Sequence, residues 1–301
     1  MRLPDFIVIG GMRCGTTTLY HLLRQCGGIY MPPVKEIHFF DRRNPALDES
    51  AARYAEVFSA AGSAQRCGEV TPDYLTTHRC AERIHALVPD VRLVTILRDP
   101  VERAWSHYLV SCLNGVETLP LAEALEAEPE RLGDGTDRSD IFFSYLQRSR
   151  YVEHLERYEA LFGRKAMLVL FLEELATDAA GQGKRLLEHL GVPAVQIPSR
   201  PNLAEANEMG DLYWHHNAGS VARPRALLYR LGRVIEGRNT WRNEAQEVSA
   251  LRRRTGRRLQ RLALPLPRLT PGDRADLGRR LADHDSALSR WLGRAPPWTP
   301  G

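Results

Sequence analysis

Near its N-terminus the chain reads Phe6-Ile7-Val8-Ile9-Gly10-Gly11-Met12-Arg13-Cys14-Gly15-Thr16-Thr17-Thr18. An apolar run is followed by two glycines, a basic residue, another glycine and three threonines, and an amphipathic pattern then begins at Leu19. This order predicts a buried strand, a tight loop and the N-terminus of a helix. Free N–H groups and the positive end of the helix dipole attract anions, so we expect the loop to bind phosphate or sulfate. A glycine-rich turn without a ligand is the alternative interpretation.

Beyond this stretch, apolar strands alternate with amphipathic helices. Further strands are expected at 67–70, 91–97 and 166–171, and helices at 19–26, 46–60, 81–87, 100–112, 151–162 and 182–190. Such alternation is typical of a parallel sheet, so we predict a three-layer α/β fold with helices flanking the sheet. Residues 113–140 contain a short helix among glycine, proline and acidic residues and are expected to form a flexible excursion. One domain is predicted over residues 1–301, with a core at 5–192 and with acceptor loops and a helical C-terminal extension at 193–301.

Composition narrows the classes of function. The chain of 301 residues is 43% hydrophobic and 26% charged, with a net charge of +4, which suits an anionic ligand without demanding nucleic acid. Its five cysteines lack paired or metal-ligand spacing, so we expect reduced thiols in a cytoplasmic protein and no metal site. No apolar run reaches about 18 residues and no signal-peptide pattern precedes the first strand, so no membrane span is expected. The sequence leaves open whether the chain forms a homo-oligomer.

The glycine loop differs from the loop of nucleotide hydrolases. Their pattern is GxxxxGK[ST], whereas here the lysine after the last glycine is missing and Arg13 lies two places before that glycine. The strand that ends at Leu97 leads into Arg98 rather than into an acidic ligand for Mg²⁺. The loop therefore has the means to hold phosphate, and the machinery for nucleotide hydrolysis is absent.

A second motif begins where the strand at 91–97 ends. It reads Arg98-Asp99-Pro100-Val101-Glu102-Arg103-Ala104-Trp105-Ser106. Asp99 fits the cap of a helix and Pro100 its first turn. Ser106 follows about two helical turns later on the same side, so Arg98 and Ser106 can face one pocket.

Together these two motifs resemble those of the sulfotransferases that use 3′-phosphoadenosine 5′-phosphosulfate (PAPS), especially the heparan-sulfate-type and bacterial enzymes. The resemblance implies a P-loop-NTPase-like fold and adenosine 3′,5′-bisphosphate (PAP) as the product. It places the 5′-phosphosulfate on the loop residues and the 3′-phosphate on Arg98 and Ser106. The loop residues concerned are Arg13, Cys14, Gly15, Thr16, Thr17 and Thr18. Arg13 stands where these enzymes usually carry lysine; it keeps the charge and gains a bidentate fork.

A third segment reads Lys35-Glu36-Ile37-His38-Phe39-Phe40-Asp41. By the same resemblance, Glu36 is the general base that accepts the acceptor's proton, with His38 and Asp41 as supports or substrate contacts. Glu36, Arg13 and His38 are thus the predicted catalytic residues. A surface ion pair between Glu36 and Lys35 is the alternative. If the segment alternates strictly as an extended chain, Asp41 lies on the face opposite Glu36 and His38.

Several other features carry weaker signals. Val70 stands where relatives have a lysine near the sulfonate, so either Arg13 carries more of the charge or Glu69 and Asp73 reorganise the acceptor side. Thr71 and Tyr74 are secondary candidates, with a turn cap and a core aromatic as alternatives. The helix N-terminus is expected to lower the pKa of Cys14. His215 and His216 are assigned to a loop, and the arginines of 252–261 to a solvated helix face or a contact for an anionic acceptor.

The resulting hypothesis is transfer of sulfonate from PAPS to a hydroxyl of an acceptor, by in-line displacement. The acceptor is a small or carrier-bound molecule; a bacterial natural product, a lipid or a saccharide is favoured, and no nucleic acid is expected. Two alternatives are an ATP-dependent kinase on the same fold and a non-catalytic nucleotide-binding protein.

Overall fold

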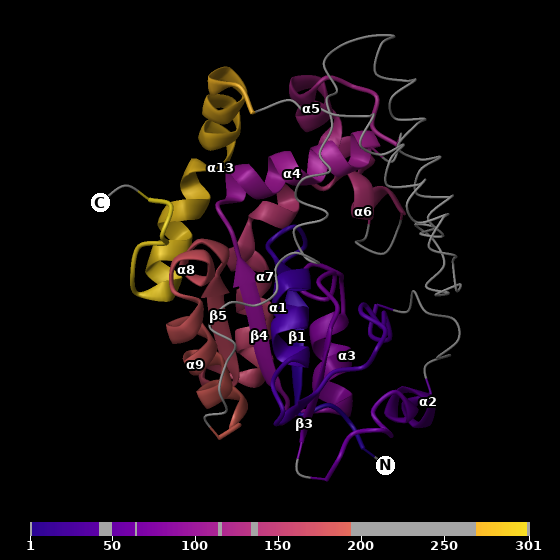
Figure 1. The fold of residues 1–301 in the computed structure, drawn as a ribbon. Coiled ribbons are helices and arrows are strands. Elements are labelled where there is room, and N and C mark those ends of the chain that lie inside the picture. Colours follow the sequence, from indigo (N-terminus) through magenta and orange to yellow (C-terminus); the bar gives the residue numbers. More distant parts are fainter. Residues whose placement is uncertain are drawn as a thin grey trace, which may run out of the picture.

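The computed structural model describes residues 2–41, 50–63, 65–113, 116–133, 138–193 and 269–299. Within these ranges a parallel sheet has the strand order β2-β3-β1-β4-β5 (Figure 1). The strands are β1 (Phe6–Gly10), β2 (Ile29–Tyr30), β3 (Arg66–Val70), β4 (Arg92–Leu97) and β5 (Met167–Phe171). The predicted parallel sheet is confirmed, and the strand that enters the glycine loop lies at its centre.

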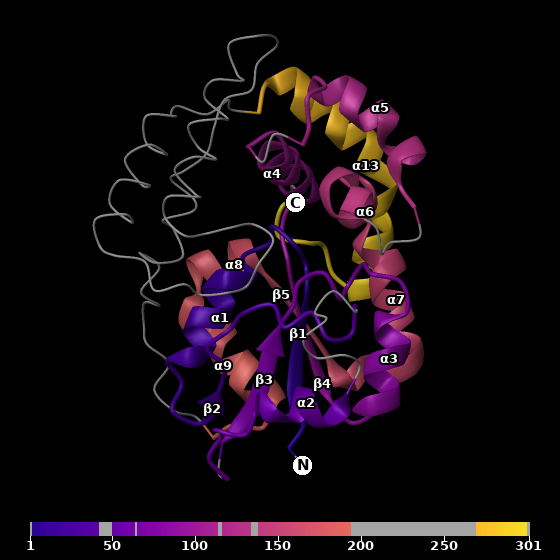
Figure 2. The ribbon, with the colours of Figure 1, turned by 90° about the vertical axis from the view of Figure 1, so that its right-hand side faces the viewer.

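Helices cover both faces of the sheet. One layer holds α1 and α9 with α8, and the other holds α3 and α7 (Figure 2). The bounds are α1 (Thr16–Arg24), α2 (Ala51–Glu56), α3 (Cys80–Leu87), α4 (Pro100–Leu113), α5 (Leu121–Arg131), α6 (Arg138–Phe143), α7 (Tyr151–Phe162), α8 (Leu172–Thr177), α9 (Ala179–Leu190) and α13 (Pro271–Leu292). Two 3-10 turns, η1 (Gln147–Ser149) and η2 (Arg164–Ala166), flank α7.

The sequence of the central strands follows from this double cover. All five residues of β1 are buried, and in β4 only Arg92, at its start, is exposed. A strand that is covered on both faces is largely apolar rather than alternating, as the runs at 6–9 and 93–97 show, with Thr95 as the one polar residue. The apolar stripe of the first helix, Leu19, Leu22, Leu23 and Cys26, is buried as expected.

The region from 113 to 140 differs from its prediction. Its described part forms two helices, α5 and α6, and α5 buries Leu121, Ala124 and Leu125 against Trp105 and Tyr108 of α4. The expected flexible excursion is therefore wrong for these residues, because their apolar face completes a second hydrophobic cluster above the sheet. Two of its acidic residues, Glu117 and Glu128, are buried and accept hydrogen bonds within this cluster.

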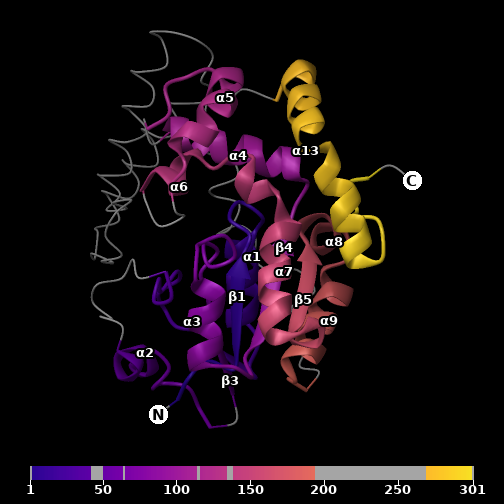
Figure 3. The same cartoon turned by 180° about the vertical axis from the view of Figure 1, so that it is seen from behind.

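The predicted C-terminal helix is confirmed as α13. It lies beside α4 and α7 (Figure 3) and buries Leu277, Leu281 and Leu288. Within the described ranges, no helix combines the length and apolar character needed to span a bilayer. The predicted acceptor loops after 193, the pair His215-His216 and the arginines of 252–261 lie outside the described residues.

Gly68 marks the tightest contact between β3 and β1. It pairs with Phe6, and a Cβ at position 68 would lie 2.4 Å from the Phe6 ring. We expect Gly68→Ala to lower the free energy of unfolding by about 2 kcal/mol or more, because neither the ring nor the paired strands can move away freely. Urea unfolding would measure the change.

Gly27→Ala is the matched control for this variant, since a Cβ at Gly27 meets no atom within 4 Å. Its free energy of unfolding should stay within about 0.5 kcal/mol of the wild-type value. Equal stability of the two variants would contradict the packing described here.

Candidate active site

The glycine loop is held at the carboxyl ends of the central strands. The Gly11 N–H donates to the Ile96 carbonyl at 2.8 Å, which ties the loop to β4. Gly15 precedes α1 and has a φ of 95°, which is unfavourable for any residue with a side chain. A Cβ at this position would also clash with Leu172 Cδ1, at 2.7 Å, so only glycine fits here. Of the three threonines at the helix N-terminus, Thr16 is buried, Thr17 is exposed and Thr18 is partly exposed. The Thr17 hydroxyl is therefore the most accessible of them to a ligand.

Cys14 departs from its prediction. Its side chain is fully buried, with Sγ 3.7 Å from the Tyr151 hydroxyl, and this burial raises the thiol pKa to about 11. The expectation of a lowered pKa is wrong, because loss of water around the thiolate outweighs the favourable field of the nearby arginines. The thiol points into the core, and the Cys14 N–H donates to the Gly11 carbonyl at 3.2 Å, so both donors of Cys14 are turned to the protein rather than to a ligand.

Arg13 joins the two motifs that the sequence singled out. Its Nε donates to Ser106 Oγ at 3.0 Å, although the residues are 93 positions apart. Ser106 is only 4% exposed and lies on α4, and Arg13 adopts a left-handed conformation with φ 68°. The structure thus brings the loop and the face of α4 that carries Ser106 into one site.

Arg98 occupies the junction of β4 and α4. The Asp99 carboxylate accepts from the Val101 N–H at 2.8 Å, confirming the predicted helix cap. Arg98 Nη2 lies 3.2 Å from Glu102 Oε2. Arg274 of α13 pairs with the other oxygen of Glu102 and lies 3.5 Å from Asp99. These ion pairs hold α13 against the N-terminal turn of α4, next to Arg98.

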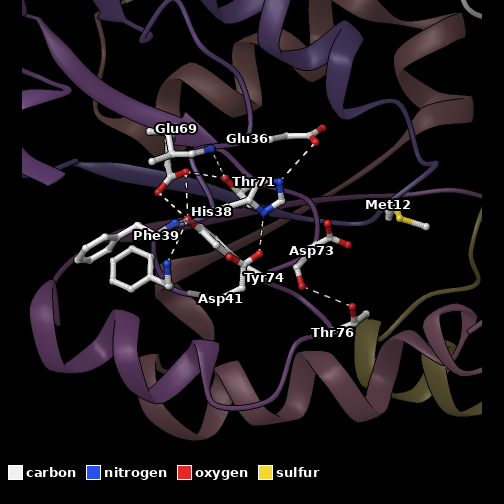
Figure 4. A network of polar contacts seen from close by, with 12 residues as sticks. Met12, Glu36, His38, Phe39, Asp41, Glu69, Thr71, Asp73, Tyr74 and Thr76 are labelled. Carbon is white, nitrogen blue, oxygen red and sulfur yellow. Dashed lines mark hydrogen bonds and ion pairs between the residues drawn. The ribbon is translucent and has the colours of Figure 1, made fainter. Parts of the chain in front are cut away.

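The segment that follows Lys35 is not a regular extended chain. Glu36 and His38 both have left-handed backbone angles, with φ 66° and 56°. As a result His38 Nδ1 lies 2.7 Å from Asp41 Oδ2 while His38 Nε2 lies 3.8 Å from Glu36 Oε2 (Figure 4). Strict alternation, which would have put Asp41 on the opposite face, is thus wrong. The three side chains form one row from Glu36 through His38 to Asp41.

Glu36 is accessible at the end of this row. Its side chain is 38% exposed, and its N–H donates to the Val70 carbonyl at 3.0 Å, which anchors it beside the end of β3. The ion pair with Lys35 that the sequence left open is present. Asp41, at the other end, has a fully buried side chain. A buried carboxylate that faces one ring nitrogen fixes the orientation of the imidazole.

Behind this row lies a buried carboxylate, Glu69. It accepts hydrogen bonds from Thr71 at 2.7 Å and from Tyr74 at 3.3 Å (Figure 4). A third hydrogen bond comes from Tyr54 at 2.5 Å. Thr71 Oγ1 in turn accepts from the Ile37 N–H, and the Tyr74 hydroxyl accepts from the Phe39 N–H. Glu69 thereby holds the whole segment that carries Glu36 and His38.

The sequence named Glu69, Thr71 and Tyr74 only as secondary candidates and missed Tyr54. The sequence did carry one signal for this network: Glu69 lies just before the end of a buried strand, and the hydroxyl residues Thr71 and Tyr74 follow two and five places later. Tyr54 offered none, because its contact with Glu69 depends on where α2 packs. Burial raises the pKa of Glu69 to about 7, against the opposing effect of the hydrogen bonds from Tyr54 and Thr71.

A further charged pair lies between this cluster and the glycine loop. Asp73 forms an ion pair with Arg148, and Arg148 Nη1 also lies 3.5 Å from Met12 Sδ. Oxygen or nitrogen atoms of His38, Asp41 and Asp73 all lie within 4.8 Å of one another. Asp41 is hydrogen-bonded to His38, and Asp73 is paired with Arg148. The negative charges of both carboxylates are therefore balanced by protein groups.

The raised pKa of Glu69 predicts a pH-dependent stability. The folded state holds the proton up to about pH 7, whereas the unfolded carboxyl releases it near its ordinary value of 4.5. Folding therefore weakens as pH rises between these values. From about pH 5 to about pH 8, the stability of the wild type relative to Glu69→Gln should fall by about 2.5 kcal/mol, as measured by urea unfolding.

Glu153→Gln is the control, because the side chain of Glu153 is 61% exposed. Its stability relative to the wild type should not change over the same interval. If Glu69→Gln behaved like this control, the assigned pKa of Glu69 would be wrong.

Comparisons with known proteins identify the family of the chain. A family model described as sulfotransferase domain matches residues 3–209. Human heparan sulfate glucosamine 3-O-sulfotransferase 3B1 is 31% identical over 198 residues, covering 64% of this chain and 47% of that protein. Human heparan sulfate glucosamine 3-O-sulfotransferase 6 is 30% identical over 198 residues. This alignment covers 64% of this chain and 54% of that protein. The chain thus spans about half the length of the curated relatives it matches.

Solved structures give the same result. A sulfotransferase from Alicyclobacillus acidocaldarius is 27% identical, with a TM-score of 0.58 over 70% of this chain and 92% of that one. Mouse SULT7A1, solved in complex with PAP, covers 97% of this chain and 89% of its own at a TM-score of 0.51; at 15% identity it supports the fold alone. By the match of the family model and the fold, this chain belongs to the sulfotransferase family.

Proposed function

We propose that this chain transfers the sulfonate group of PAPS to a hydroxyl group of an acceptor. The observation that carries the proposal is the contact between Arg13 and Ser106, with its Nε–Oγ distance of 3.0 Å. It joins a loop suited to a 5′-phosphosulfate to the helix on which a 3′-phosphate site is expected. A nucleotide with phosphate groups at both positions matches such a divided site better than a nucleoside triphosphate does.

On the donor side, the N-terminus of α1 and Arg13 face the 5′ end of the nucleotide. Thr17 and Thr18 supply hydroxyls, and the backbone N–H groups of residues 15–18, at the N-terminus of α1, supply donors that need no rearrangement. Arg98 and Ser106 bind the 3′-phosphate. Glu102, 3.2 Å from Arg98, is the group that the phosphate has to displace from this guanidinium.

The reaction proceeds by in-line displacement at sulfur. The acceptor oxygen forms a bond to sulfur while the bond from sulfur to the 5′-phosphate oxygen breaks. PAP leaves with the electron pair of that bond, so negative charge grows on its 5′-phosphate. Arg13 and the loop N–H groups stabilise this charge. The acceptor's proton passes to Glu36, and the products are the sulfate ester and PAP.

Glu36 acts as the base because it is the accessible member of the row. Its carboxylate faces His38 Nε2 at 3.8 Å, and Asp41 fixes the imidazole from the other side at 2.7 Å. His38 thus orients Glu36 toward the acceptor. Glu69 is only 1% exposed and has hydrogen bonds to both oxygens, so its role is to support the segment rather than to take the proton.

For the acceptor we propose a hydroxyl of a saccharide, a lipid or a natural product. The names of several relatives refer to the glucosamine of heparan sulfate, so a saccharide is the first class to test. The assay uses PAPS with a panel of hydroxyl compounds of the three classes, and mass spectrometry identifies the ester formed.

Donor selectivity gives the first test. PAP should raise the melting temperature strongly, because it engages Arg98 and Ser106 as well as the loop, whereas ATP with Mg²⁺ lacks the 3′-phosphate. At a concentration of about 100 Kd the stabilisation by PAP corresponds to about 2.7 kcal/mol. Differential scanning fluorimetry measures both ligands. Equal shifts for PAP and ATP would favour a kinase-like nucleotide site instead.

The assigned base gives the second test. Glu36→Gln should lower kcat for sulfonate transfer about 100-fold or more and leave the Kd for PAP within about threefold, because it removes only a proton acceptor. The control is Glu56→Gln, an exposed carboxylate at the end of α2, which should keep full activity. Wild-type turnover in the Glu36→Gln variant would exclude Glu36 as the base. A wild type that binds PAP and esterifies no acceptor would support the non-catalytic alternative.

A further inference from the structure

Arg148 is a buried guanidinium that belongs to none of the motifs above. It is 4% exposed and lies in η1, just before α7. Its Nε donates to Ser144 Oγ at 2.8 Å, and its Nη1 contacts Asp73 and Met12. Its Nη2 makes no hydrogen bond to any residue in the described ranges. The guanidinium is therefore fixed on one side and has donor capacity left on the other.

The position of Arg148 is defined by two neighbours. Met12 directly precedes Arg13 in the glycine loop, so one contact of Arg148 is with the donor side of the site. Asp73 lies within 4.8 Å of His38 and Asp41, so the other contact is with the row that ends in Glu36. Figure 4 shows Asp73 on the side of His38 that faces Met12. Arg148 bridges the two halves of the site.

A group that passes from the donor to the acceptor has to cross between these halves. The sulfonate starts at the glycine loop and ends on an oxygen whose proton goes to Glu36. Its three terminal oxygens carry negative charge throughout. A preorganised cation beside this path, in a place with little water, stabilises that charge more than a mobile surface cation would.

The side chains near this path are either apolar or already paired, so Arg148 is the cation best placed to contact the sulfonate. Val70, at the end of β3 nearest Glu36, is apolar and 1% exposed. Lys35 pairs with Glu36, and Arg13, which donates to Ser106 on α4, is already assigned to the leaving 5′-phosphate. Resting on the proposed function, we propose that the Arg148 guanidinium contacts the transferring sulfonate and is a further catalytic residue of this sulfotransferase.

The closing experiment compares PAPS with PAP, which lacks the sulfonate. Arg148→Gln should lower kcat/KM for PAPS about 100-fold and leave the Kd for PAP within about threefold, since the only contact with the nucleotide that is lost is the one to the sulfonate. Arg148→Lys keeps the charge but loses the fork, so it should recover part of the activity, to within about tenfold of the wild type. The Kd for PAP is measured by calorimetry.

Two controls separate this role from a structural one. Arg148→Gln leaves Asp73 buried without its partner, so the double variant Asp73→Asn/Arg148→Gln is included; it removes both charges and should fold with the same loss of transfer. Arg131→Gln removes another guanidinium from a buried carboxylate, Glu117, 2.7 Å away, and should keep kcat/KM for PAPS within about twofold.

The outcomes are distinct. Parallel losses of PAP binding and of transfer in Arg148→Gln would show that Arg148 only shapes the loop, and unchanged kcat/KM for PAPS would remove it from the mechanism; either result overturns the inference. If instead the wild type neither binds PAP nor transfers sulfonate, the proposed function itself falls.

Discussion

The active site depends on the parallel pairing of β1 with β3 and β4. Phe6 pairs with Gly68 on one side and with Arg92 on the other, so the carboxyl ends of the three strands meet at one edge of the sheet. Backbone bonds continue past the strands: the Thr71 N–H donates to the Val8 carbonyl, and the Gly11 N–H donates to the Ile96 carbonyl. The glycine loop, the turn after β3 and the start of α4 are therefore held together before any side chain contributes.

On this frame, buried polar groups determine the shape of the acceptor side. Glu69 and its hydroxyl partners hold the backbone of the segment from Ile37 to Phe39 by two N–H donors. Left-handed angles at Glu36 and His38 are unfavourable for residues with side chains, and they persist because this network and the buried Asp41 over-determine the local conformation. The ionisable groups of the site and the packing of the core are thus parts of the same structure.

Local pattern was enough for the fold and for the donor motifs. Strand β1, the cap at Asp99 and the helices after each strand follow from apolar periodicity and capping chemistry, whereas a shared pocket for Arg98 and Ser106 stays a prediction from helical spacing. The site required information that the sequence does not carry locally. The contact of Arg13 with Ser106, the burial of the Cys14 thiol and the left-handed turn before Asp41 all depend on elements far apart in the chain. Arg148 was missed because no motif surrounds it.

Arg274 of α13 forms ion pairs with Asp99 and Glu102 at the start of α4. Glu102 is shared between Arg98, the expected phosphate ligand, and Arg274, so the final helix and the nucleotide draw on the same carboxylate. If the 3′-phosphate displaces Glu102 from Arg98, as proposed above, Glu102 is left to Arg274. In that case, occupancy of the nucleotide site and docking of α13 would be linked equilibria, with the coupling equal in both directions. On the proposed function, α13 would then take part in ligand affinity although it lies outside the motifs that bind the nucleotide.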